Sequence, residues 1–333
     1  AVLAAAAAVG ATVAPVSAAP MTTADGFIFA AGNATASPDA HNNVSYGVVA
    51  NGTATSIAVG QGNTITSANG SSSAYGNQNT VNGNQANAFG DGNTVKGAYA
   101  QAFGDTNDVN GTNAIGYGYK NTVKESDANF RDRDYDNESD DRTKKLGDWR
   151  SNSVAIGSEN TAAGSSALAV GHNANALMNE SIAIGHSANA ARTWSTAIGT
   201  RANASEVRSQ AIGYEAEAAG YKANAIGSGA QATGAHTNAI GSSAIASGDH
   251  AQAYGAGAQA QGVRANAFGS DAHATADHAM AIGDHSVVTD VNSVAIGYQS
   301  QSAPATAVNS ATVMTSSITS GAPIATHTYS GFA

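Results

Sequence analysis

One short pattern recurs along most of the chain: an alanine, a large apolar residue and a glycine. The first five large residues follow one another at spacings of 16, 14, 14 and 12 residues, and they are Val59, Tyr75, Phe89, Phe103 and Ile115. After a gap, eleven more occur at intervals of 14 residues: Ile156, Val170, Ile184, Ile198, Ile212, Ile226, Ile240, Tyr254, Phe268, Ile282 and Ile296. A fixed period of this kind is typical of a solenoid, in which each repeat forms one coil.

The alternation inside each repeat predicts two β-strands per coil. Ser209 and Ala211 are small and flank the polar Gln210, which is the period-two pattern of a strand. A few residues later, Ala216 and Ala218 flank Glu217 in the same manner. We therefore expect an all-β fold, a parallel β-roll of about 14-residue coils. Glycine is expected at the turns, where a positive φ costs it little.

The polarity of the two strands predicts which side chains face inward. Alanine and polar residues alternate in the second strand, so alanine faces the interior and the polar residues face water. The first strand can match that alanine layer only with its own small residues, so its large apolar residues lie outside. The alternative is a monomeric β-helix with the isoleucines inside and the small residues outside.

An exposed apolar stripe of this length needs a cover. The same stripe of identical subunits around a rotation axis is the simplest cover, so we expect a homo-oligomer. The predicted interface residues are Val154, Ile156, Val170, Ile184, Ile198, Ile212, Ile226, Ile240, Tyr254, Phe268, Ile282 and Ile296.

Composition supports a thin, repetitive core. Only 11% of the 333 residues are charged, against about 25% in typical globular proteins, and most apolar residues are alanine. The net charge of −10 argues against nucleic acid or an anionic membrane as the main partner. The absence of cysteine excludes disulfides and thiolate metal sites.

These patterns divide the chain into five segments. Residues 1–20 are expected to be a signal-peptide remnant, with an alanine-rich leader as the alternative. Irregular repeats occupy residues 21–119, a charged loop insertion occupies 120–150, and regular repeats occupy 151–302. Residues 303–333 form a Ser/Thr/Ala-rich connector.

The insertion is the richest segment in charge. Residues 120–150 hold 17 of the 38 charged residues of the chain, and the repeats resume after it. Insertions in solenoids map to one face and often bind partners. Its candidate ligand-binding residues are Arg131, Asp132, Arg133, Tyr135 and Trp149. The alternatives are a loop packed on a neighbouring subunit and an inert spacer.

Calcium is not expected in the insertion, although its carboxylates alternate. A calcium loop beginning at Asp132 would need glycine at its sixth position and glutamate at its twelfth, where Asn137 and Thr143 stand. The sequence also lacks a Ser-His-Asp arrangement, a zinc-protease motif and a phosphate-binding loop. We therefore expect no enzyme, no cofactor and no metal.

Two segments with the sequence Asn-Ser-Val-Ala-Ile-Gly, at residues 152–157 and 292–297, carry a resemblance to a known family. With the repeated triplets, they resemble the head domain of YadA-like trimeric autotransporter adhesins over about residues 50–300. The resemblance implies a left-handed parallel β-roll and a homotrimer. It also implies a bacterial cell-surface location, with anchoring in the outer membrane through a stalk and a C-terminal region that this sequence does not contain. The head itself would not contact the membrane.

The resemblance also implies adhesion to a host matrix protein such as collagen or to a cell-surface receptor. By the family's motif, Asn152, Ser153, Asn292 and Ser293 are candidate ligand-binding residues. The alternative is that the motif holds the trimer together, because its valine and isoleucine belong to the predicted interface. A second functional hypothesis is a spacer or self-association module that promotes autoaggregation or biofilm.

An ice-binding solenoid is disfavoured. Ice binders need regular ranks of threonine, whereas Asn175, Asn189, Asn203, Glu217 and Gln231 occupy the outward second-strand positions of successive coils.

Overall fold

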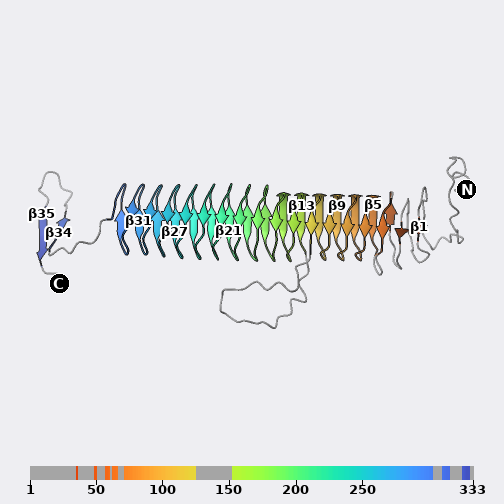
Figure 1. Cartoon of the computed structure of the whole chain (residues 1–333), viewed down its shortest axis with the longest axis horizontal. Coiled ribbons are helices and arrows are strands. Elements are labelled where there is room, and N and C mark those ends of the chain that lie inside the picture. The colour runs from red at the N-terminus through yellow and green to blue at the C-terminus, as the bar shows by residue number, and fades with distance from the viewer. Residues whose placement is uncertain are drawn as a thin grey trace, which may run out of the picture.

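The computed structural model describes residues 57–60, 62–66, 71–124 and 152–302, together with four short strands at 35–36, 49–50, 310–315 and 325–330. Two long parallel sheets dominate it, of 16 and 17 strands, and each coil contributes one strand to each sheet (Figure 1). The register confirms the period, since Ala211 pairs with Ala225 and Ile212 with Ile226. The predicted all-β parallel solenoid is therefore confirmed.

The 16-stranded sheet holds the first strand of each coil. Its members are β3 (Ile57–Val59), β5 (Ser73–Asn77), β7 (Asn87–Asp91), β9 (Gln101–Asp105), β11 (Ile115–Tyr119), β13 (Val154–Ser158), β15 (Leu168–His172), β17 (Ile182–Ile184), β19 (Thr196–Ile198), β21 (Gln210–Ile212), β23 (Asn224–Ile226), β25 (Asn238–Ile240), β27 (Gln252–Tyr254), β29 (Asn266–Phe268), β31 (Met280–Ile282) and β33 (Val294–Ile296).

The 17-stranded sheet holds the second strands, each of two residues. Its members are β1 (Thr35–Ala36), β2 (Val49–Ala50), β4 (Thr64–Ile65), β6 (Thr80–Val81), β8 (Thr94–Val95), β10 (Asp108–Val109), β12 (Thr122–Val123), β14 (Thr161–Ala162), β16 (Asn175–Ala176), β18 (Asn189–Ala190), β20 (Asn203–Ala204), β22 (Glu217–Ala218), β24 (Gln231–Ala232), β26 (Ile245–Ala246), β28 (Gln259–Ala260), β30 (His273–Ala274) and β32 (Val287–Val288).

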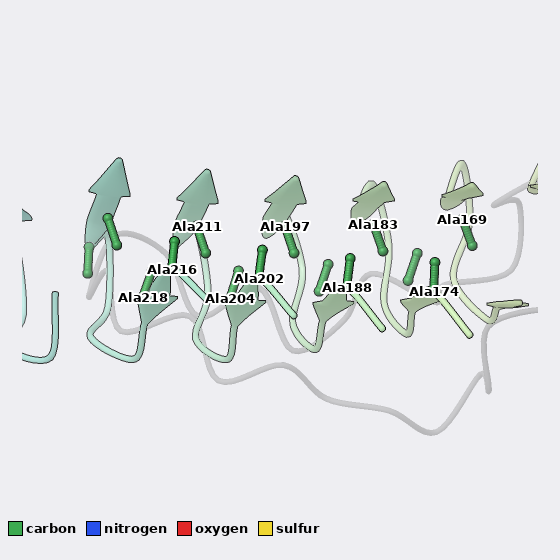
Figure 2. Packing of buried hydrophobic residues seen from close by; sticks show 14 of the residues in the cluster. Ala169, Ala174, Ala183, Ala188, Ala197, Ala202, Ala204, Ala211, Ala216 and Ala218 are labelled. Carbon is green, nitrogen blue, oxygen red and sulfur yellow. The ribbon is translucent and has the colours of Figure 1, made fainter. Parts of the chain in front are cut away.

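Alanine fills the narrow space between the two sheets. Ala197 and Ala211 come from the first sheet and point toward Ala202 and Ala216 on the other side of the roll (Figure 2). All four are completely buried. The large residue after each alanine lies on the outer surface, for example Ile212 after Ala211. The predicted faces are thus correct, and the alternative with isoleucine inside is wrong.

The N-terminal coils use a different interior from the C-terminal ones. At the first inward position of the second-strand segment they carry buried asparagine, and two residues later they carry isoleucine or valine, except after Asn160, where Ala162 stands. The buried asparagines are Asn63, Asn79, Asn93, Asn107, Asn121 and Asn160. From Ala174 onward, alanine occupies that position in every coil as far as Ala272.

Each interior asparagine satisfies backbone groups of its own and the next coil. The Nδ2 group of Asn107 donates to the carbonyl oxygens of Phe103 and Gly118, at 3.2 and 2.9 Å. Its Oδ1 accepts from the backbone N–H and the Nδ2 of Asn121, at 3.0 and 2.9 Å. This ladder keeps buried polar groups paired, which a buried backbone requires.

The structure corrects the register at Ile115. Tyr117, not Ile115, pairs with Phe103 and with Ile156. Gly116 takes the inward place that alanine fills elsewhere, because a Cβ there would lie only 2.6 Å from Cγ2 of Val109. The spacing of 12 was therefore a misassignment, and the period of 14 holds from Tyr75 to Tyr117.

The insertion begins later than position 120. Strand β12 pairs with β10 and β14, and the backbone N–H of Lys124 donates to the carbonyl of Ala162 at 2.9 Å. Tyr117 and its pairing partner Ile156 are 39 residues apart, against 14 between neighbouring coils from Tyr75 to Tyr117 and from Ile156 onward, so this connection carries 25 extra residues. Residues 125–151 lie outside the described part of the chain.

Glycines at the second turn serve a steric purpose rather than the expected conformational one. Gly220 and Gly234 do not have a φ in the left-handed region, but a Cβ on Gly220 would lie 1.8 Å from the carbonyl oxygen of Gly234 in the next coil. The left-handed residues are two positions later and are not glycine, for example Lys222 with φ 55° and His236 with φ 58°. Close stacking of coils, not positive φ, explains these glycines.

The two ends of the chain are described only in part. The expected leader at residues 1–20 lies outside the described residues. In the connector range, β34 (Ser310–Thr315) and β35 (Ala325–Ser330) form an antiparallel pair. The described ranges contain no helix with the length and hydrophobicity to cross a membrane.

Candidate interaction surfaces

The outer face of the 16-stranded sheet carries an unbroken apolar column, which we call the large-residue stripe. Its members are Val59, Tyr75, Phe89, Phe103, Tyr117, Ile156, Val170, Ile184, Ile198, Ile212, Ile226, Ile240, Tyr254, Phe268, Ile282 and Ile296. Pairing in register stacks equivalent side chains. The rings of Tyr75 and Phe89 stack at 4.9 Å, and those of Phe89 and Phe103 at 5.1 Å.

Much of this stripe remains accessible in the single chain. Ile156 is 40% exposed, Phe268 37% and Ile296 70%, while most of the other members are half-buried by their stacked neighbours. A continuous apolar surface of this kind marks an interaction site.

A second outward column lies two residues before the stripe, and its character changes along the roll. Towards the N-terminal side it includes Ile115, Val154, Leu168 and Ile182, and at the C-terminal end Met280 and Val294. Between them it is polar. The polar residue that the strand pattern has at Gln210 does not hold for Leu168, Ile182 and Met280, which are apolar members of this column.

The polar middle of the second column forms a ladder of amides. The Nδ2 group of Asn224 donates to Oδ1 of Asn238 at 2.7 Å, and Asn238 donates to Oε1 of Gln252. The hydroxyl of Tyr254, in the stripe, donates to the same Oε1 at 3.2 Å. The amides are therefore partly satisfied among themselves.

The two Asn-Ser-Val-Ala-Ile-Gly segments each begin in the second turn and continue into a first strand. Asn152 and Asn292 are exposed, with φ 36° and 56°. Ser153 is completely buried, and its hydroxyl donates to the carbonyl of Gly164. Ser293 is half-buried and donates to the carbonyl of Val291 at 3.4 Å. Burial removes Ser153 from the residues that an external ligand could contact.

Comparison with known families decides what this roll is. The YadA head domain repeat matches residues 151–174, 176–202, 195–216, 260–286, 274–300 and 289–310. These matches fall between residues 151 and 310, so this part of the roll contains YadA-like head repeats. Comparison with curated proteins gives no match.

Repeats of this family mark an adhesin-type domain of the trimeric autotransporter kind. The matched repeats belong to the part of the roll with an alanine interior, together with the last asparagine coil. The coils before the insertion, with asparagine and valine inside, lie outside the matches but pair in the same two sheets.

The predicted ligand-binding residues of the insertion lie outside the described part of the chain. These are Arg131, Asp132, Arg133, Tyr135 and Trp149. The pairing of β11 with β13 and of β12 with β14 brings the two ends of the insertion to one edge of the head, at the second turn.

The outer face of the 17-stranded sheet differs between the two halves of the head. In the N-terminal coils it presents threonine at the position where most coils from Asn175 to Gln259 carry amides: Thr64, Thr80, Thr94, Thr122 and Thr161. The residues from which regular threonine ranks were excluded, Asn175 to Gln231, all come after this rank. Asp108 interrupts it, and Lys96 and Lys124 are exposed beside it.

Titratable groups on the head stack without forming a metal site. His172 and His186 stack at 5.1 Å, and Nε2 of His172 lies 3.9 Å from Oε2 of Glu159. The pKa of Lys120 is raised above its ordinary value, first by a hydrogen bond with the Tyr119 side chain and then by charge interactions. Nowhere in the described ranges do three His, Asp or Glu side chains gather as metal ligands would.

Proposed function

We propose that this chain is the head of a homotrimeric adhesin on the bacterial surface, which attaches to a host matrix protein such as collagen or to a cell-surface receptor. The observation that carries the proposal is the large-residue stripe. It lies outside a roll whose interior is already filled, mostly by alanine, and no other element of the described part of the chain covers it.

The geometry of the stripe supports three-fold assembly. Every coil offers a similar apolar residue at one place, and successive coils are about 4.8 Å apart. Three parallel copies around an axis would therefore meet layer by layer, with three equivalent side chains in each layer. Closed rotational symmetry covers the stripe of every subunit at once.

The ligand-contacting surface would lie on the polar faces and on the insertion. Asn152, Asn292 and Ser293 stay candidates for ligand binding because each is at least partly exposed. The five insertion residues named above also stay candidates. Val154 and Ile156 belong to the proposed trimer interface. Three copies of a weak site on one rigid head would give useful avidity.

The first experiment measures the mass of the whole chain in solution by light scattering at neutral pH. A mass of three chains supports the trimer, whereas a single-chain mass contradicts it. The same protein is then tested for binding to immobilised collagen and other matrix proteins. A variant without residues 126–150 restores a 14-residue coil and separates the insertion from the roll as the site of binding.

Self-association is the second candidate function. Low charge, and the threonine and amide side chains on the outer face of the 17-stranded sheet, favour contact between heads. Bacteria that display the protein would then capture purified head, while surfaces coated with matrix proteins would not. Capture on matrix alone would contradict this alternative.

A further inference from the structure

One edge of the head carries a row of basic and aromatic side chains. At the left-handed position of the second turn, six successive coils present Arg208, Lys222, His236, His250, Arg264 and His278, with φ between 55° and 60°. Trp194 occupies the same position in the preceding coil, with φ 58°. We call these seven residues the second-turn edge. All are exposed or half-buried, and six steps of about 4.8 Å give a row of roughly 29 Å.

Contacts between successive coils hold much of this row in place. The guanidinium of Arg208 lies over the Trp194 ring at 4.8 Å and donates to the Tyr221 hydroxyl at 3.4 Å. The ring of Tyr221 meets His236 edge-on at 5.4 Å, and His236 stacks on His250 at 4.9 Å. The row is therefore ordered before any ligand arrives.

Outside residues 120–150, most lysines and arginines lie in the second turns of these coils. The chain has 14 lysines and arginines, of which eight lie in residues 120–150. Of the six others, Arg192, Arg208, Lys222 and Arg264 lie in the second turns of these coils. Such a concentration stands out in a chain with a net charge of −10.

The second turns of these coils also carry three acidic residues, against four lysines and arginines. They are Glu206, Asp249 and Asp277. Oδ1 of Asp249 accepts the backbone N–H of Ala235 at 3.0 Å, and Oδ1 of Asp277 accepts that of Val263 at 2.8 Å. These two carboxylates are thus engaged with the backbone of the preceding coil.

From this arrangement we infer that the second-turn edge binds an extended anionic polysaccharide, sulfated or carboxylated. Six successive coils each place one lysine, arginine or histidine in a straight row, and Arg208, Lys222 and Arg264 are its permanent charges. Such a row suits a linear polymer better than a compact anion. Single-stranded nucleic acid fits less well, because its bases stack on exposed aromatic rings. Here Arg208 already covers one face of the Trp194 ring. The inference deepens the proposed adhesin function and rests on it for its biological setting.

The test is retention of the whole chain on immobilised heparin, with hyaluronan as a carboxylated polymer and dextran as an uncharged one. The edge variant combines Arg208→Gln and Lys222→Gln, and its matched control combines Lys96→Gln and Arg201→Gln, which removes the same charge elsewhere. We expect affinity for heparin at about 0.15 M salt to fall roughly tenfold in the edge variant and to change little in the control. A third variant, Arg264→Glu, acts at an exposed position on the same edge and should also weaken binding.

Several outcomes would overturn the inference. They are equal losses in the edge and control variants, no retention of the parent on any anionic glycan, and tighter binding to a single-stranded oligothymidine than to heparin. Loss of the parent's mass in the edge variant would instead make the edge a subunit contact. Binding to matrix proteins is measured separately. A head that binds a matrix protein but not heparin would contradict the polysaccharide site and leave the adhesin proposal unaffected.

Discussion

Asparagine and alanine occupy the same interior position in the two parts of the roll. In the N-terminal coils the asparagine side chain donates to the carbonyl of the stripe residue before it, as Asn93 does to Phe89 at 3.3 Å. In the C-terminal coils alanine offers no such donor, and the backbone N–H of Gly199 donates to the carbonyl of Ile184 at 2.8 Å. The asparagine side chains thus add hydrogen bonds that the alanine coils do without.

Asn107→Ala should therefore lower the stability of the head. The substitution removes the donor to Phe103 and Gly118 and leaves the N–H groups of Asn121 without their acceptor. We expect a loss of about 2 to 4 kcal/mol in the free energy of unfolding, measured by chemical denaturation. Asn110→Ala, at an exposed position in the same coil, is the control and should change stability by no more than about 0.5 kcal/mol. Equal effects would contradict the role of the ladder.

Gly248→Ala tests the close approach of coils at the second turn. A Cβ there would lie 2.1 Å from the carbonyl oxygen of Gly262, so the coils would have to separate. We expect a loss of at least about 2 kcal/mol in a thermal or chemical unfolding experiment. Gly229→Asn is the matched control, because a Cβ at Gly229 lies 3.7 Å from its nearest neighbour and Ser243 holds the same left-handed position in the next coil. A control as damaging as Gly248→Ala would show that steric contact is not the cause.

At the scale of elements, strands of two to five residues are long enough to form the two sheets, because every coil repeats the same pairing with its neighbours. The first strands shorten from five residues in β15 to three in β17, one coil after the interior changes from Asn160 to Ala174. Parallel pairing in register then places identical side chains in columns, which is what makes the large-residue stripe continuous.

Ile212→Asp combined with Ile240→Asp should prevent assembly. Three carboxylates in one buried layer cannot all ionise cheaply beside one another. We expect light scattering to give the mass of one chain, with the circular dichroism of the roll preserved. Gln231→Asp with Gln259→Asp adds the same charge to the outer face of the other sheet and should leave the mass of three chains unchanged. A double isoleucine variant that still forms a trimer would refute the proposed interface.

At the scale of the whole molecule, each coil contacts mainly its two neighbours, so the stability of the head is approximately a sum over coils and their interfaces. Removing one complete coil, residues 213–226, joins Ile212 to Gly227 and keeps every register. We expect this deletion to shift the melting temperature by only a few degrees.

A deletion of half a coil provides the contrast. Removing residues 213–219 takes away β22 while β21 and β23 remain, so the two sheets lose their common period. We expect a much lower melting temperature or aggregation. Similar behaviour of the two deletions, followed by circular dichroism, would contradict independent stacking of coils.

The sequence by itself determined the period, the two strands per coil and the inward alanines. It could do so because a solenoid repeats one local pattern, and a period-two alternation assigns each side chain to a face. It identified the stripe from Ile156 to Ile296 for the same reason. Where the pattern was irregular, at Ile115, the local triplet was misleading.

Only the tertiary structure decided which residues align between coils. Pairing put Tyr117 rather than Ile115 into the stripe and placed β12 inside the roll. It showed that Ser153 is buried and that second-turn glycines allow close stacking. It also brought Trp194 and the cations after it into one row, because residues 14 apart become neighbours only when the coils stack.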